Sequence, residues 1–303
     1  MAYIRLSLYL CHQQTKSVIK MRTQVSKIFL ILSLSAFFLI GCTPKTKQST
    51  ENNIKFDSIT VEKTYHLFEN PENPNCNLQI KFIYPVKFSN NEILKKIQAQ
   101  FVLGYFGENY EALAPQEAVN SYTEEYLKSY KELEADFKEE LEKSEAGEGP
   151  VGSWFSYYES SNNEIIYNQN DILSYTIYFE NYTGGAHGAH STTNHVLNLK
   201  NGTIITEEDI FVEDFHDSLA QMLVNQIAKQ NDVSNIKDLE NIGFFSVDEI
   251  TPNGNFLVDE NGITYSFNEY EIAAYVVGVT NVHLPYENIR HLLKPESPIS
   301  HLY

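Results

Sequence analysis

Apolar and polar residues alternate along several stretches of the chain, as expected for strands with one buried face. The pattern occupies "DSITVEKTYHLF" (57–68) and "CNLQIKFIYPVKF" (76–88), and the turn-rich "ENPENPN" separates the two. It returns in "SWFSYYESS", "NEIIYNQ", "ILSYTIYFENY" and "HVLNLKNGTIIT". We predict strands in all of these segments. Asn201-Gly202, between two alternating runs, favours a two-residue hairpin.

Other stretches repeat apolar residues at steps of three and four, the spacing of one helix face. Ser89 to Glu92 reads as a capping box that opens the helix "EILKKIQAQFVLGYF" (92–106). A longer helix should end at "AGEGPVG" (146–152). Its apolar positions include a tyrosine stripe, which we interpret as a buried face and not as a sugar-stacking platform: Val119, Tyr122, Tyr126, Tyr130, Leu133, Phe137 and Leu141.

The C-terminal third repeats this mixture. Leu219, Leu223 and Ile227 indicate another amphipathic helix, and "FLVDENGITYSF" (256–267) a second hairpin. "EYEIAAYVVG" (269–278) fits a helix or a buried strand, "VTNVHLPY" a strand and "YENIRHLL" a closing helix. Grouped strands with few helices between them favour an α+β fold with antiparallel sheets and packed helices. We predict two subdomains, residues 55–183 and 184–303.

The N-terminal segment has the features of an export signal. From Met21 it reads "MRTQVSKIFLILSLSAFFLIGC", in which a basic start precedes an apolar run too short to span a bilayer. Its end, Leu39-Ile40-Gly41-Cys42, resembles the bacterial lipobox, which implies cleavage before Cys42 and lipidation of its thiol. We therefore expect a signal peptide over 1–41 that truly starts at Met21, and a lipidated tether over 42–54.

The exported part would be strongly acidic. Residues 1–41 hold five of the 22 basic residues and none of the 40 acidic ones, which leaves a formal charge of −23 on residues 42–303. Such a surface disfavours nucleic acid and anionic membranes and attracts cationic partners, although it can also serve solubility alone. Beyond Cys42 only Cys76 remains, so no intrachain disulfide is expected.

The stretch "GGAHGAHSTTNH" (184–195) contains three of the nine histidines. If it is extended, His187 and His195 share a face about 26 Å apart and His190 points the opposite way. The spacing H-S-x-x-x-H resembles one family of metal-dependent deacetylases, but the chain lacks the Asp-Asp pair that this family uses. No other catalytic motif occurs. We therefore predict no metal, no cofactor and no catalytic residue here.

Two longer segments resemble the RsiV-like extracellular domain family, to which the non-catalytic N-terminal region of PdaC-type deacetylases also belongs. They are "YTGGAHGAHSTTNHVLNLKNGTIITEEDIF" and "FLVDENGITYSFNEYEIAAYVVGVTNVHLPYENIRHLL", within a resemblance that spans about residues 55–293. The resemblance implies a domain that binds and does not catalyse; one relative binds lysozyme. The candidate binding or structural residues are Tyr182, Gly184, Gly185, His187, His190, His195, Tyr270, Glu271 and Tyr275.

These observations lead to one functional hypothesis and one alternative. The first is an envelope-anchored lipoprotein, in the outer membrane if the cell has two membranes, that recognises a cell-wall glycan or a cationic protein such as lysozyme. The alternative is a metal-dependent hydrolase or deacetylase that acts on cell-wall glycan through His187, His190 or His195.

Overall fold

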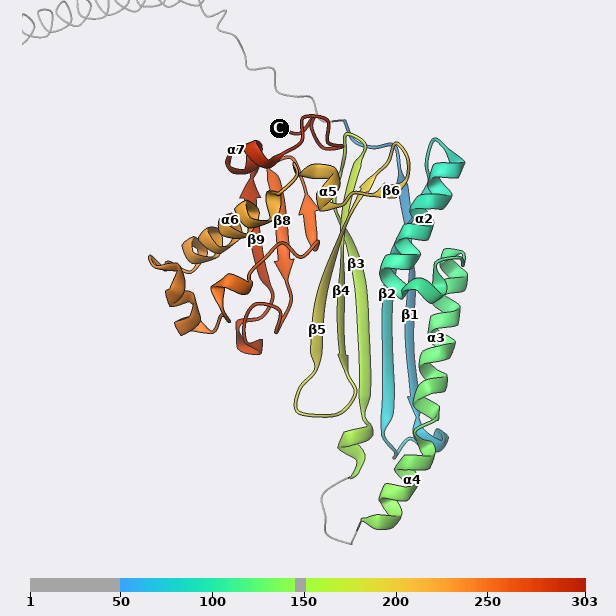
Figure 1. Cartoon of the computed structure of the whole chain (residues 1–303). Coiled ribbons are helices and arrows are strands. Elements are labelled where there is room, and N and C mark those ends of the chain that lie inside the picture. Colours follow the sequence, from blue (N-terminus) through green and yellow to red (C-terminus); the bar gives the residue numbers. More distant parts are fainter. Residues whose placement is uncertain (1–49, 145–150) are drawn as a thin grey trace, which may run out of the picture. The chain divides into compact units, whose positions relative to one another are not determined.

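A six-stranded sheet occupies the first part of the computed structural model, which describes residues 50–144 and 151–303 (Figure 1). Its spatial order follows the chain: β1 (Lys55–His66), β2 (Asn75–Lys87), β3 (Tyr157–Gln169), β4 (Ile172–Tyr182), β5 (Ala189–Asn198) and β6 (Thr203–Ile204). Neighbouring strands are antiparallel except β2 and β3, which run parallel. The sheet is therefore mixed. The parallel pair is possible because a helical crossover connects β2 to β3.

The crossover consists of three helices: α2 (Asn91–Phe106), α3 (Pro115–Lys131) and α4 (Glu134–Lys143). The residue that caps α2 is Asn90 and not Ser89, since its side chain accepts hydrogen bonds from the backbone of Glu92 and Ile93. The single long helix that we predicted is broken in two. The break lies where Glu134 turns to the β1–β2 connection and accepts hydrogen bonds from Tyr65 Oη and Phe68 N, both 2.7 Å long.

Aromatic residues fill the layer between these helices and the sheet. Phe101 stacks on Tyr175 with ring centroids 4.1 Å apart, and both side chains are fully buried. The tyrosine stripe of α3 also points inward, as predicted: Tyr122 packs against this layer, and Tyr130 is buried in a smaller cluster with Leu67. Leu141, which we placed at the end of the same buried face, is 48% exposed. The Tyr122 hydroxyl donates to Glu159 at 2.5 Å. Burial is the main cause of the raised pKa of that carboxyl group.

The second part of the chain forms a lobe around a three-stranded antiparallel sheet, β7 (Phe256–Val258), β8 (Gly262–Phe267) and β9 (Thr280–Pro285). Three helices belong to this lobe: α5 (Glu207–Ile210), α6 (Phe215–Gln230) and α7 (Tyr286–Ile289). The predicted hairpin at Asn261-Gly262 is confirmed. Short 3-10 turns complete the described chain: Leu67–Glu69, Glu108–Tyr110, Val151–Phe155, Ile236–Ile242, Val247–Glu249, Tyr275–Val277 and Arg290–Leu292.

The prediction of a helix or buried strand over 269–278 is wrong. This segment is irregular apart from the single turn Tyr275–Val277, and Tyr270 has a left-handed φ of 64°. The Glu271 carboxylate accepts from Asn268 N at 2.8 Å, while Glu271 N donates to the carbonyl of Asn268 at 3.1 Å. These reciprocal bonds close a tight turn that a regular helix or strand cannot accommodate.

The lobe covers part of the sheet face opposite the helices. Tyr175 and His195 point to the helix side, so their sequence neighbours Ser174 and Asn194 point to the lobe. Ser174 Oγ donates to Val258 O at 2.6 Å, and Asn194 Nδ2 donates to Ser266 Oγ at 2.8 Å. The boundary that we placed between 183 and 184 falls between β4 and β5, which pair over ten residues. The first sheet thus extends past it to Ile204.

The last residues of the predicted tether, 50–54, pack against the domain and do not form a free polar linker. Ile54 is buried, and Asn52 Nδ2 donates to the carbonyl of Ile172 at 2.8 Å. Residues 50–54 therefore pack on the β3–β4 turn. The predicted signal peptide, Cys42 and the rest of the tether lie outside the described residues, as does most of "AGEGPVG". In the described ranges, no helix combines the length and the apolar character that a membrane span requires.

Candidate binding site beside the histidine stretch

Two glycines shape the connection between β4 and β5. Gly184 and Gly185 have φ angles of 88° and 104°, a left-handed conformation that residues with a Cβ rarely adopt. A Cβ on Gly184 would lie 2.9 Å from the carbonyl oxygen of Trp154, whereas a Cβ on Gly185 would meet no atom within 4 Å. The hydroxyl of Tyr182 donates to the Gly185 carbonyl at 2.9 Å and closes the loop. The glycines thus hold the loop that presents His187.

The two motifs that the sequence suggested separately meet in space. His187 stacks on Tyr275 with ring centroids 4.2 Å apart, and its Nε2 lies 3.4 Å from the hydroxyl of Tyr270. His190 approaches the same ring, with Nδ1 3.4 Å from the Tyr275 hydroxyl. We call His187, His190, Tyr270 and Tyr275 the histidine–tyrosine cluster. His187 and His190 contact one tyrosine together because His187 lies in the turn and not on an extended strand.

Carboxylates flank the cluster. His190 Nε2 lies 3.7 Å from Glu180, and His190 Nδ1 lies 3.5 Å from Glu269. Partial loss of water around the Tyr275 hydroxyl, and then the negative charge of Glu269, raise the pKa of this tyrosine. Tyr275 therefore stays a neutral hydroxyl at physiological pH. The cluster combines exposed aromatic rings with two acidic groups.

More tyrosines extend the cluster towards β3. Tyr158 stacks on Tyr182 at 6.3 Å, and a Cβ on Gly188 would lie 3.0 Å from the Tyr158 hydroxyl. Tyr158, Tyr178 and Tyr270 are among the exposed large apolar residues of the described chain, and so is Trp154, which is 67% exposed. Exposed aromatic side chains near one another are typical of recognition surfaces.

His195 and Glu271 lie apart from the cluster. The ring of His195 stacks on Tyr175 on the helix side of the sheet, where the absence of a side chain at Gly104 makes room for it. Its Nε2 is buried and has no hydrogen-bond partner among the described residues. Burial lowers the pKa of His195 to about 4, so the imidazole is neutral. Glu271 holds the turn described above, and its other carboxylate oxygen accepts from Asn253 Nδ2 at 2.6 Å.

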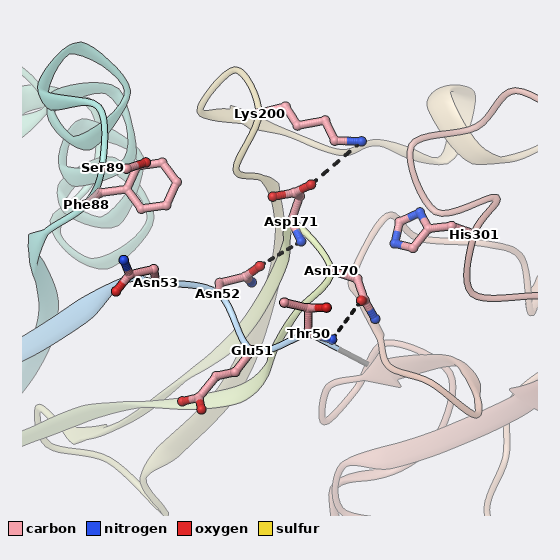
Figure 2. A pocket seen from close by; sticks show the side chains of 10 residues that line it. All are labelled: Thr50, Glu51, Asn52, Asn53, Phe88, Ser89, Asn170, Asp171, Lys200 and His301. Atoms are coloured by element: carbon pink, nitrogen blue, oxygen red, sulfur yellow. Dashed lines mark hydrogen bonds and ion pairs between the residues drawn. The ribbon is translucent and has the colours of Figure 1, made fainter. Parts of the chain in front are cut away.

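A cavity of about 290 Å³ lies next to the cluster, on the part of the sheet face that the lobe leaves open. Side chains of β3, β4 and β5 line it: Ser160, Asn162, Tyr178, Glu180, His190 and Thr192. A second cavity, of about 530 Å³, lies where residues 50–53 meet the β3–β4 turn (Figure 2). There Lys200 pairs with Asp171 at 3.8 Å, and Asn170 accepts from Thr50 N. These contacts join the β3–β4 turn to residue 50 and to Lys200, so the polar groups of this cavity serve the fold.

The described residues can be checked for two common features of catalytic sites, a metal cluster and a nucleophile beside a histidine. Within residues 50–144 and 151–303, no group of three or more histidines, cysteines or carboxylates is placed to hold a metal ion. No described serine or cysteine lies within hydrogen-bond reach of His187 or His190, as nucleophilic catalysis would need. What the arrangement offers is aromatic faces, hydroxyl and amide groups, and carboxylates for binding.

These features define a two-lobed α+β domain with an exposed aromatic and acidic site. Family models match both parts: "Deacetylase PdaC" over residues 69–190 and "Protein of unknown function (DUF3298)" over residues 208–287. Hence the PdaC-type N-terminal region of our sequence interpretation is confirmed, and the DUF3298 match accounts for most of the second lobe. No curated protein matches the chain.

Solved structures support the same assignment. A DUF3298 family member from Bacteroides fragilis is 35% identical, with a TM-score of 0.78, and the match covers 83% of this chain and 97% of that one. A DUF3298 protein from Pseudomonas aeruginosa shares the fold at 14% identity, with a TM-score of 0.54 and coverage of 84% and 98%. The chain belongs to the DUF3298 family.

Sequence reasoning missed several residues of the site. Glu180, Glu269 and Tyr178 were absent from our candidates, since in so acidic and tyrosine-rich a chain these residues carry no signal by themselves. A period-two count along β4 would place Tyr178, Glu180 and Tyr182 on one face. The contact between Glu269 and His190, across 79 positions, requires the fold.

Proposed function

We propose that this protein is an envelope-anchored lipoprotein that binds a cell-wall component or a cationic wall-active protein such as lysozyme, and catalyses no reaction. The observation that carries the proposal is the histidine–tyrosine cluster, whose exposed rings stand beside Glu180 and Glu269. The resemblance of the sequence to RsiV-like extracellular domains supports binding as the activity. The region matched as PdaC would then act here as a non-catalytic part of the binding domain.

The chemistry of the cluster suits both kinds of ligand. Aromatic faces attract cations and also pack against the apolar faces of sugars. Carboxylates accept hydrogen bonds from sugar hydroxyls and pair with lysine or arginine. The charge of −23 on residues 42–303 would speed the approach of a cationic protein.

Binding can be measured with the chain from residue 42 onward, made soluble by Cys42→Ser. Immobilised lysozyme and purified cell-wall sacculi serve as the two ligands. The double variant Tyr270→Ala, Tyr275→Ala should weaken binding at least about tenfold, since clustered aromatic residues often dominate recognition. Phe245→Ala, which alters an exposed ring outside the cluster but beside the same segment, is the matched control. Unchanged affinity in the double variant would contradict the site.

The salt dependence of the rates separates the two ligand types. Between 0.01 M and 0.1 M salt the Debye length falls from about 30 Å to about 10 Å. Association with lysozyme should therefore slow markedly over this range, while dissociation changes far less. Binding to a neutral glycan should hardly depend on salt. If neither ligand binds at 0.01 M salt, the proposal fails.

The anchor and the enzymatic alternative have separate tests. Cys42→Ser should abolish incorporation of labelled palmitate, and label that persists would contradict lipidation. In a cell with two membranes, Thr43 after the lipidated cysteine favours the outer membrane. Stoichiometric zinc in the purified protein, lost on His190→Ala, would favour a metal-dependent hydrolase.

A further inference from the structure

The cavity beside the histidine–tyrosine cluster is built from three adjacent strands in register. Ser160 on β3, Glu180 on β4 and His190 on β5 face one another in one row. Asn162, Tyr178 and Thr192 form the next row, and Tyr158 with Tyr182 lies on the other side. Because side chains on a strand alternate between faces, all of these point to the same open side of the sheet. Tyrosine rings thus lie on both sides of a polar row, Tyr178 on one side and Tyr158 with Tyr182 on the other.

Some polar side chains of this cavity make no hydrogen bond within the fold. Among the described residues, the side chains of Ser160 and Asn162 have no hydrogen-bond partner, and Asn162 is exposed. Glu180 has only the 3.7 Å contact with His190, made by one of its two carboxylate oxygens. A ligand can therefore exchange hydrogen bonds with a hydroxyl, an amide and a carboxylate without breaking any internal bond.

The tyrosine rings on both sides of the polar row are also exposed to a ligand. Tyr178 is 38% exposed and Tyr158 is 36% exposed, although both belong to the middle of a sheet. From Tyr178 to Tyr182 the strand advances about 13 Å at the usual rise. Rings separated in this way, with hydroxyl and amide groups between them, fit an extended ligand that has apolar faces and polar edges. Sugars linked in a chain have this alternation.

We propose that the open cavity binds a neutral polysaccharide strand, such as one of N-acetylated sugars, with a ring stacked on Tyr178 and its hydroxyl or amide groups bonded to Ser160, Asn162 and Glu180. The inference rests on the binding function proposed above and names its ligand class. A single carboxylate among uncharged polar side chains favours a glycan over a lysine- or arginine-rich segment, which would need several acidic partners.

Calorimetric titration tests the proposal on the chain from residue 42 onward with Cys42→Ser. The probes are a tetramer of N-acetylglucosamine and soluble glycan strands prepared from cell wall. Saturable binding is expected to at least one of them, and binding of the uncharged tetramer should depend little on salt between 0.01 M and 0.1 M. Tyr178→Ala should weaken it at least about tenfold, because it removes the stacking ring, and Asn162→Ala several-fold, because it removes an unbonded amide.

Ile166→Ala is the matched control, because Ile166 is exposed on β3, the strand of Asn162, but does not line the cavity. It should leave the affinity unchanged. Lysozyme binding without binding of either glycan would overturn the glycan assignment and leave the proposed function intact. Absence of binding to sacculi, glycans and lysozyme would overturn both. Glycan binding that survives Tyr178→Ala together with Asn162→Ala would place the site elsewhere.

Discussion

The lobe-facing side of the six-stranded sheet has two halves that are similar in composition and different in their bonding. Under the second lobe, Ser174, Thr176 and Asn194 are buried, and each side chain has a hydrogen-bond partner. Beyond the lobe, Ser160 and Asn162 have none among the described residues. A buried polar group without a partner is costly, whereas an exposed one bonds to water that a ligand can replace. The same residue types therefore hold the lobe in one half and remain available in the other.

The covered half also protects the edge of the sheet. The amide of Asn268 accepts from Thr192 N at 2.7 Å, and that of Asn255 accepts from Asn194 N at 2.7 Å. Asn255 Nδ2 donates in return to the carbonyl of Thr192 at 2.9 Å. Two side chains thus bond to β5 as a further strand would. Free strand edges promote aggregation, and these amides remove that hazard at the lobe junction.

Asn194→Ala should give the largest effect on stability, a loss of about 3 kcal/mol. It breaks the bonds from Thr176 Oγ1 and to Ser266 Oγ, both 2.8 Å. The buried Thr176 hydroxyl loses its acceptor, at a cost of roughly 1–3 kcal/mol, and Ser266 keeps only its bond to Asn281. Urea unfolding measures the change. Asn162→Ala, the same substitution in the open half, should change stability by less than about 0.5 kcal/mol. Equal losses in the two variants would remove the contrast between the halves.

His195 and His190 provide a second contrast on one strand, because His195 is packed inside and His190 is exposed. The folded pKa of His195, about 4, lies below its unfolded value of about 6.5. The unfolded chain therefore binds a proton first, and stability should fall as pH drops from about 6.5 to about 4, by about 2.5 kcal/mol. Unfolding of His195→Gln across this range should show a flatter profile than the native chain. A profile flattened by His190→Ala instead would contradict the assignment.

Gly185→Val should lower stability by about 1–2 kcal/mol through the backbone alone. The φ of 104° disfavours a β-branched residue, although a Cβ there would meet no other atom. His190→Ala, in the same stretch, should change the melting temperature little because its ring is exposed. Thermal unfolding of both variants measures the difference. A glycine variant that keeps its stability but loses ligand binding would make the loop itself part of the recognition surface.

Much of the fold follows from local patterns in the sequence. Alternation predicted the strands, and Asn-Gly pairs predicted both hairpins, since these features depend on neighbouring residues. The parallel pairing of β2 with β3 could not be predicted, because it depends on where the crossover helices return the chain. The break before Glu134 was missed for a similar reason: its cause is a contact with Tyr65, 69 positions away.

The site was predictable in part. Tyr182, the glycines and His187 were noticed as a motif, and Tyr270 and Tyr275 as another, but their contact arises only when the irregular 269–278 segment meets the β4–β5 turn. The opposite directions of His190 and His195 were predicted for an extended segment and are confirmed in β5, whereas His187 does not share the face of His195 because it lies in the turn before the strand. Residues that are close along a strand can therefore lie on opposite faces of the sheet.

Hydrogen exchange measured with and without solubilised cell wall tests most directly whether the open half of the sheet face is the binding surface. Ligand should slow exchange in residues 158–162 and 178–192 and in the 269–278 segment, with little change in α2 and α3 on the opposite face. Tyr178→Ala should reduce this protection without altering exchange in the free protein elsewhere. Protection centred on the helices, or on the cavity near residues 50–53, would contradict the account.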